Sequence, residues 1–305
     1  MNNFKVVMYH YVREYNKNIQ NLNFFDLKIF EKQLDYFEKE FWFISRDDWI
    51  RFTNWEKVNL NWVLLTFDDW LSCHYKYVLP ILKKRKLWWL FFINSWPLKN
   101  KKLLNVHKVH YLLWKYDIDE LYNIYISVSN KLKIEINFNI NNEYKHQNLD
   151  EKTLFFKSIN YIFPIDIQNK ILEEIFKYYS INEEELFEIF YMNKNQIKKL
   201  IKNWNLIWWH TENHILLSKY NENFLTKEIL ESNKYLEKEF NIKIKNFAIP
   251  YWTKSSYNDN ILSILKNYWI KNNFIVENKD FIWNNNLKIT RYDCNALKYW
   301  KFFIN

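Results

Sequence analysis

Short apolar runs alternate with longer amphipathic segments through much of the chain. Segments 25–40 and 75–86 have helical periodicity, and Asp26 is the predicted N-cap of the first. This alternation predicts an α/β fold, either a barrel or a doubly wound sheet, with functional groups at the carboxyl ends of its strands. The predicted strands are residues 4–12, 62–67, 90–93, 205–210, 246–251 and 272–277.

The alternation of predicted strands and helices is interrupted between about residues 100 and 200. Two long stretches there have helical periodicity, and an asparagine-rich join near 137–149 separates them. We interpret this region as a helical insertion in a single domain that spans residues 1–305.

Charge and hydropathy exclude several classes of protein. The net charge of +9 comes from a lysine-rich composition interspersed with 35 acidic residues, without the dense basic stripe expected of a nucleic-acid-binding protein. The N-terminus lacks the pattern of a signal peptide, and no apolar run approaches the roughly 18 residues of a transmembrane helix. We therefore expect a cytoplasmic protein, or one peripheral to a membrane, of unknown oligomeric state. Cys73 and Cys294 are expected to be reduced thiols.

Three polar motifs follow predicted strands. Asp68 and Asp69 end the run "VLLTFDD", and two adjacent carboxylates there can point in different directions. His210 and His214, in "HTENH", are spaced to lie on one face of a helical turn, and two imidazoles with one carboxylate form a ligand set of catalytic metals. The third motif, "FAIPYW" (247–252), ends in a tight turn whose backbone N–H groups can face an oxyanion.

Together these motifs resemble the polysaccharide deacetylases with a NodB homology domain, carbohydrate esterase family 4. The family's "TFDDG", "H(S/T)xxH" and "PYG" correspond to "TFDDW", "HTENH" and "PYW" in this sequence. The segments "MYHYV", "FEKQLDYF", "HYKYVLPILKK", "FFIN" and "RYDCN" extend the resemblance over nearly the whole chain. It implies a NodB-type distorted (β/α) barrel.

The resemblance also implies an activity, the metal-dependent N-deacetylation of an N-acetylated sugar or polysaccharide, such as a cell-envelope glycan. Asp69, His210 and His214 would hold a divalent metal, with zinc expected. Asp68 would be the general base, and the backbone N–H of Tyr251 would stabilise the oxyanion.

Four further residues are expected to contact substrate. His10 either lines the pocket or is a hydrogen-bonded structural histidine. Arg291 either pairs with Asp293 to support the site or belongs to an ordinary surface pair. The complete expected set is His10, Pro250, Trp252 and Arg291.

Two departures from the family pattern leave an alternative open. Phe247 stands three residues before the proline of the third motif, where the family often has arginine, and no histidine follows His214, so the general acid is unassigned. A carbohydrate-binding pseudoenzyme is therefore the main alternative, and a structural or interaction protein that kept only the fold is another.

Other histidines have weaker patterns. His74, at a predicted helix start, is expected to face solvent or cap the helix. His107 and His110 have a spacing that permits a metal pair but usually has no functional meaning.

Tryptophan stands where this family has glycine. The chain has no glycine and 16 tryptophans, and Trp70 and Trp252 occupy glycine positions of the "TFDDG" and "PYG" motifs. We interpret the tryptophans as UGA codons for glycine that were read as tryptophan. Five more are expected at strand starts or turns, where glycine relieves a positive φ: Trp42, Trp96, Trp204, Trp208 and Trp269. The indoles expected to crowd the metal pocket are those of Trp70, Trp208, Trp209 and Trp252.

Overall fold

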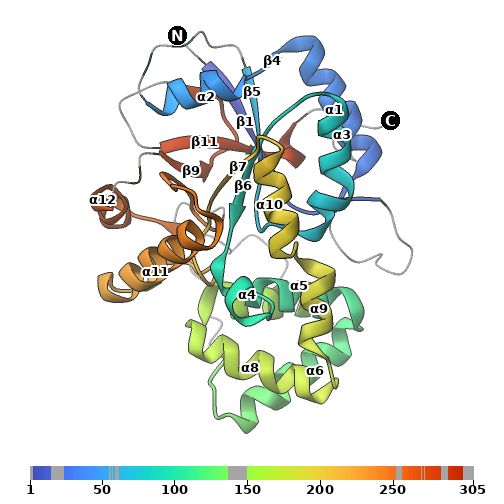
Figure 1. The fold of residues 1–305 in the computed structure, drawn as a ribbon. Coiled ribbons are helices and arrows are strands. Elements are labelled where there is room, and N and C mark those ends of the chain that lie inside the picture. The colour runs from blue at the N-terminus through green and yellow to red at the C-terminus, as the bar shows by residue number, and fades with distance from the viewer. Residues whose placement is uncertain are drawn as a thin grey trace.

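The centre of the molecule is a closed barrel of parallel strands (Figure 1). The computed structural model describes residues 3–14, 24–54, 56, 58, 62–136, 150–251, 256–268, 270, 272–282 and 288–297. The strands follow one another around the barrel in chain order, and pairing of the first with both the second and the last closes it. This arrangement confirms the predicted (β/α) barrel. Its strands are β1 (Asn3–Tyr9), β5 (Trp62–Phe67), β6 (Leu90–Ile93), β7 (Leu206–Trp209), β8 (Asn246–Ala248), β9 (Asn272–Val276) and β11 (Lys288–Asp293).

The sequence patterns of the inner strands explain their position. β5 and β6 are apolar or uncharged throughout and buried at every residue, as expected of parallel strands covered on both faces. Their bounds are those predicted. Short strands complete the sheets: β4 (Trp42–Phe43) beside β5, β10 (Phe281–Ile282) antiparallel to β1, and a separate pair, β2 (Val12–Arg13) and β3 (Phe25–Asp26).

One apolar cluster fills the barrel. It takes residues from all seven barrel strands, which is possible only inside the barrel, and helix α2 (Arg46–Thr53) adds Trp49 and Phe52. Alternate strand residues point outward into a second cluster shared with the surrounding helices. The barrel core includes Phe4, Val6, Leu64, Leu90, Phe92, Trp208, Ala248, Phe274 and Ile289.

Helices cover the outside of the barrel. In α1 (Leu27–Glu40) the Asp26 side chain accepts from the backbone N–H groups of Lys28 and Ile29, which confirms the predicted N-cap. The predicted helix 75–86 begins as a π-helical turn, η2 (His74–Val78), before α3 (Leu79–Lys84). Figure 1 shows the long helix α11 (Glu222–Phe240) and α12 (Asp259–Asn267) on the side of the barrel away from α1 and α3. The remaining outer elements are α4 (Ser95–Asn100), η5 (Leu217–Lys219) and η7 (Cys294–Ala296).

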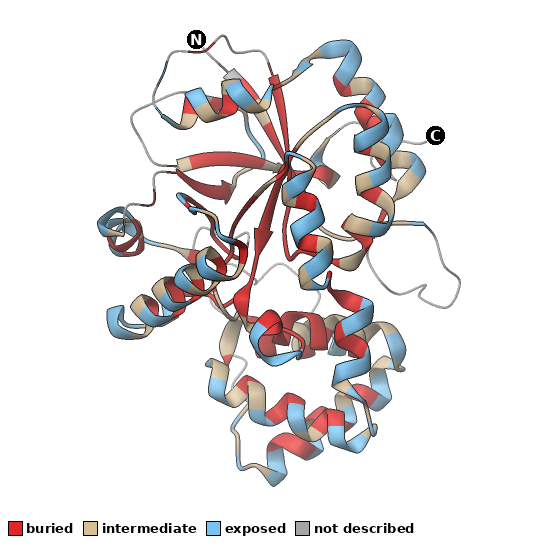
Figure 2. Cartoon of the chain, viewed as in Figure 1, coloured by how far each residue is buried: buried red, intermediate tan, exposed pale blue. Residues whose placement is uncertain are grey.

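The predicted insertion is helical between β6 and β7 in the part of the chain that the structure describes. Helices from α5 (Asn105–Lys115) to α9 (Glu183–Phe190) gather at one end of the molecule and turn buried faces toward each other (Figure 2), and α10 (Lys194–Lys202) runs back beside the barrel strands (Figure 1). Their apolar side chains join the outer cluster of the barrel, so the two parts share one hydrophobic core. The asparagine-rich join lies outside the described residues. The insertion also comprises α6 (Ile118–Lys131), α7 (Glu151–Lys157), η4 (Ser158–Ile162) and α8 (Ile165–Tyr178).

Cys73 and Cys294 are buried free thiols, as predicted. Among the helices that the structure describes, none is both long and apolar enough to span a membrane.

Few of the described tryptophans have the backbone that glycine favours. Trp70 (φ 42°) and Trp204 (φ 69°) are left-handed. The same expectation is wrong for Trp42, Trp96 and Trp208, which lie in strand β4, helix α4 and strand β7, where φ is negative. Trp269 lies outside the described residues.

Candidate active site

Asp68 and Asp69 leave the end of β5 in different directions. Asp68 continues the inward-facing side of the strand, two residues after Thr66. Asp69 has a left-handed backbone, φ 66°, which turns its carboxylate away from that of Asp68. Both side chains are buried. The two carboxylates can therefore have separate roles, as the motif predicts.

The "HTENH" segment is a bent loop and not the helical turn that its spacing suggested. Thr211 and His214 both have left-handed backbones, with φ of 66° and 52°. The Thr211 hydroxyl accepts from the backbone N–H of His214 at 2.9 Å. This tight bend brings the imidazoles of His210 and His214 together, with ring centroids 4.9 Å apart.

Neighbouring elements hold this loop in place. Glu228, buried on α11, accepts from the backbone and side-chain nitrogens of Asn213 at 2.6 and 2.8 Å. Asn94, after β6, donates to the backbone carbonyl of His210. Burial raises the pKa of Glu228 to about 7, although its bonds to Asn213 oppose that shift. The loop is thus fixed from both sides.

Asp69, His210 and His214 form a group with the geometry of a metal site. One ligand atom from each lies within 4.8 Å of the others, and Asp69 Oδ1 is 3.7 Å from the Nε2 atoms of both histidines. Ligand atoms about 2.1 Å from a tetrahedral zinc ion lie roughly 3.4 Å apart, close to this spacing. Asp69 Oδ1 is buried without a hydrogen-bond partner among the described residues, so it is available as a ligand atom for a metal ion.

The protonation states also fit a metal. Burial lowers the pKa of His214 to about 3 and lowers that of His210, so both imidazoles are neutral. His210 Nδ1 bonds the backbone carbonyl of Ala248 at 2.8 Å, which leaves Nε2 as the free ligand atom. Burial would raise the pKa of Asp69, but its electrostatic interaction with the neighbouring His214 and the hydrogen bond from His107 hold it well below its usual value.

Arg291 pairs with Asp68, and the expected pairing with Asp293 is wrong. Its two terminal nitrogens donate to the two oxygens of Asp68 at 2.7 and 2.9 Å, and its guanidinium lies over the rings of Phe92 and Phe274 in the barrel core. Arg291 is fully buried, and its expected contact with substrate stays a prediction. Burial would raise the pKa of Asp68, but Arg291 and His210 lower it, and Asp68 is a carboxylate.

His10 lies beside both carboxylates, and its contact with substrate stays a prediction. Its Nε2 is 4.0 Å from Asp68 Oδ2 and 3.8 Å from Asp69 Oδ2, and its side chain is 26% exposed. His74 bonds the backbone carbonyl of His10 at 2.6 Å. His74 is fully buried, so the expectation that it faces solvent or caps a helix is wrong, and it holds the turn that carries His10.

Tyr251 packs against His214. Its ring centroid is 4.9 Å from that of His214 and 5.0 Å from that of Tyr161, and its backbone is left-handed, φ 66°. Its backbone N–H donates to no acceptor that the structure describes. Pro250 is buried just before it, and Trp252 lies outside the described residues.

His107, from the insertion, is part of the site although its spacing gave no reason to expect it. Its Nε2 is 3.3 Å from Asp69 Oδ2, and its Nδ1 bonds the hydroxyl of Tyr191. His110, one turn later, bonds Tyr11 at 3.1 Å instead. The sequence signal that could have identified His107 is its place on the apolar face of a helix, because a buried imidazole needs polar partners.

A family model described as polysaccharide deacetylase matches residues 56–272, a span that includes the carboxylate and histidine motifs. The chain belongs to the polysaccharide deacetylases. It is therefore a hydrolase of amide bonds. Comparison with curated proteins gives no match.

Solved deacetylases share the fold of this polysaccharide deacetylase. The Streptococcus pyogenes deacetylase PplD, in complex with acetate, is 17% identical with a TM-score of 0.58, over 95% of this chain and 92% of that one. A de-N-acetylase from Aggregatibacter actinomycetemcomitans is 13% identical with a TM-score of 0.56, over 95% and 94%. IcaB from Ammonifex degensii is 15% identical with a TM-score of 0.54, over 96% and 92%.

Arg291, and not residue 247, places a positive charge beside Asp68 in this deacetylase. Phe247 points outward from β8, where its ring lies 4.5 Å from that of Trp209. The guanidinium next to Asp68 comes from β11 instead. Although residue 247 is not an arginine, the Asp68 carboxylate therefore still has a buried cationic partner.

The described indoles near the deacetylase motifs, those of Trp70, Trp208 and Trp209, do not crowd the site, contrary to expectation. Trp70 stacks on Tyr191 in the outer cluster, 4.9 Å between centroids. Trp208 lies in the barrel core, and Trp209 donates to Ser232 on α11. Each indole packs away from the group of Asp69 and the two histidines.

Proposed function

We propose that the protein removes N-acetyl groups from a carbohydrate by metal-dependent hydrolysis. The observation that carries this proposal is the buried group of Asp69, His210 and His214 beside the ionised Asp68. These three residues would hold one divalent ion, with zinc expected from the ligand set. When bound, such an ion would polarise the acetyl carbonyl and lower the pKa of an adjacent water.

Asp68 is the proposed general base. Its lowered pKa keeps it ionised at neutral pH, and Arg291 fixes its orientation through two hydrogen bonds. Its Oδ2 faces the histidines, at 3.9 Å from His210 Nε2. In this position it takes a proton from the attacking water, whose oxygen bonds to the carbonyl carbon.

Two further groups complete the reaction. The N–H of Tyr251 donates to the oxyanion of the tetrahedral intermediate. His10, partly exposed and beside both carboxylates, donates a proton to the nitrogen as the carbon–nitrogen bond breaks. Acetate and a free amine leave. We propose His10 as the general acid, which the sequence motifs left unassigned.

An N-acetylated glycan is the proposed substrate, in the cell envelope as the family resemblance implies. The acetate complex of the S. pyogenes deacetylase supports an acetyl group as the part removed. The pseudoenzyme alternative rested on the absent late histidine and on Phe247. His10 and Arg291 supply an imidazole and a guanidinium at the site, so we favour catalysis.

Acetate release tests the proposal. Purified protein with one equivalent of zinc would be offered N-acetylglucosamine oligomers, other N-acetylated glycans and nucleotide sugars. We expect acetate with at least one glycan and loss of release after chelation, restored by added metal. Tight glycan binding with bound metal but no acetate from any substrate would support the pseudoenzyme instead.

A further inference from the structure

The two oxygens of Asp69 have different neighbours. Oδ1 faces His210 and His214 and has no hydrogen-bond partner among the described residues. Oδ2 is bonded by His107 Nε2 at 3.3 Å. A carboxylate with one oxygen fixed by the protein presents the other in a defined direction.

A chain of hydrogen bonds sets the donor. The backbone N–H of Leu104 donates to the Tyr191 hydroxyl oxygen at 3.1 Å. The hydroxyl is then free to donate to His107 Nδ1, which leaves Nε2 as the ring nitrogen that donates to Asp69. Leu104, Tyr191 and His107 are all buried, so no water competes for these bonds. The chain therefore specifies one tautomer of His107.

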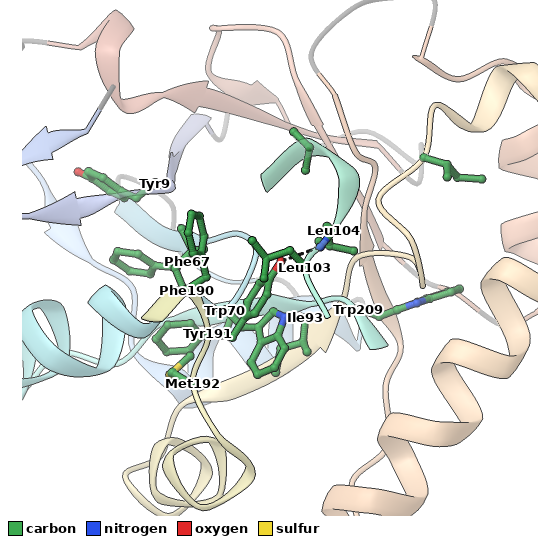
Figure 3. Packing of buried hydrophobic residues seen from close by; sticks show 14 of the residues in the cluster. Tyr9, Phe67, Trp70, Ile93, Leu103, Leu104, Phe190, Tyr191, Met192 and Trp209 are labelled. Atoms are coloured by element: carbon green, nitrogen blue, oxygen red, sulfur yellow. Dashed lines mark hydrogen bonds between the residues drawn. The ribbon is translucent and has the colours of Figure 1, made fainter. Parts of the chain in front are cut away.

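The insertion is docked onto the turn that carries Asp69. The backbone N–H of Met192 donates to the carbonyl of Trp70 at 3.3 Å, and Leu71 forms an isolated bridge with Tyr191. The Ser72 hydroxyl donates to the carbonyl of Ile189 at the end of α9. Figure 3 shows Trp70, Tyr191 and Met192 packed together, with the bond from Leu104 to Tyr191 dashed. The residues after Asp69 are thus tied to the insertion by backbone and side chain.

We propose that His107, held by Tyr191, is a positioning residue for the metal-ligating carboxylate of Asp69. The insertion is then part of the metal site and not only a cover over the barrel. His107 is not itself a ligand, because the group whose ligand atoms lie within 4.8 Å of one another comprises Asp69, His210 and His214 in the described part of the chain. The inference rests on the proposed metal site.

Zinc affinity, measured by competition with a chromophoric chelator, tests this role without any substrate. His107→Leu should bind zinc about 10 to 100-fold more weakly, the usual effect of losing a partner of a metal ligand. His107→Gln, whose amide can still donate to Oδ2, should recover part of that loss. Tyr191→Phe removes only the hydroxyl and should weaken binding less than His107→Leu. The absorption of bound cobalt should shift in His107→Leu.

His110→Leu, on the same helix, is the matched control and should leave zinc affinity unchanged. His214→Ala tests the metal site itself and should lose zinc. Normal affinity in both His107→Gln and Tyr191→Phe, or normal affinity in a folded His107→Leu, would overturn the positioning role while His214→Ala still fails to bind. Full zinc binding by His214→Ala would overturn the proposed function instead. Circular dichroism and melting of the metal-free variants separate misfolding from loss of affinity.

Discussion

Arg291 and Asp68 form a bidentate ion pair inside the barrel, with nitrogen–oxygen distances of 2.7 and 2.9 Å. The pair joins the last barrel strand to the end of β5, across residues 223 apart in sequence. A buried carboxylate without such a partner is costly to ionise. The pair therefore explains how a buried aspartate can act as a base at neutral pH.

Arg291→Met should move the pH dependence of deacetylation. The folded pKa of Asp68 is lowered, so the wild-type base stays ionised to a lower pH, whereas burial without Arg291 raises that pKa. We expect the acidic limb of kcat/KM to shift to higher pH and the rate at pH 7 to fall by about 10²-fold, with bound zinc retained. Arg85→Met, which breaks a surface pair with Asp35 and Glu38, is the control. An unmoved limb would contradict the role of Arg291.

His10→Gln should slow acetate release by about 10²-fold while zinc stays bound, because a general acid is lost. The loss should shrink for N-acetyl anilines with electron-withdrawing groups, whose nitrogen leaves without a proton. His110→Gln serves as the control. A defect equally large for good and poor leaving groups would show that His10 does not protonate the nitrogen.

Glu228→Gln should flatten the pH dependence of stability. The folded pKa of about 7 lies above the ordinary value of 4.5, so Glu228 binds its proton more tightly in the folded state. Its contribution is full below about pH 4.5 and is lost as pH rises through 7. The fall in melting temperature from pH 5 to pH 8 should be smaller in Glu228→Gln than in wild type and in Glu231→Gln, an exposed control on α11. An identical fall in all three would contradict the shift.

Trp204→Gly should stabilise the protein by up to about 1 kcal/mol, because it removes a side chain at φ 69° that is 69% exposed. Trp42→Gly is the matched control, since Trp42 is 77% exposed but lies in strand β4, where glycine destabilises. Urea denaturation measures both. If both changes stabilise the protein, or if neither does, backbone strain at Trp204 does not explain the result.

The recoding hypothesis has its own test in the gene. Trp70 combines a positive φ with a buried indole N–H that lacks a partner among the described residues, and glycine would relieve both. TGA codons at positions 70, 208, 209 and 252, in a frame poor in GGN codons, would support recoding. TGG at these positions would refute it.

Local patterns predicted six of the seven barrel strands, all but β11, and the polar residues that the fold gathers at their ends. The apolar runs of β5 and β6 are too short to be interpreted as helices, and their predicted bounds match the observed ones. Asp68, Asp69, His210 and His214 were found because they follow such strands. Each of these inferences needed only a few neighbouring residues.

Contacts between distant elements could not be predicted in the same way. Arg291 was assigned to Asp293, two residues away, because closure of the barrel, which brings it to Asp68, leaves no local pattern. His107 reaches Asp69 only after the insertion docks. The "HTENH" loop looked helical because spacing alone does not report the left-handed backbone of Thr211.

The division of roles between Asp68 and Asp69 is the central claim, and metal content with turnover in two variants tests it most directly. Asp68→Asn should keep about one zinc ion per chain and lose roughly 10²-fold or more in acetate release, because only the base is removed. Asp69→Asn should lose both metal and activity, because Oδ1 is a proposed ligand. Elemental analysis beside the acetate assay gives both quantities on one sample. Equal loss of zinc in the two variants would contradict the account.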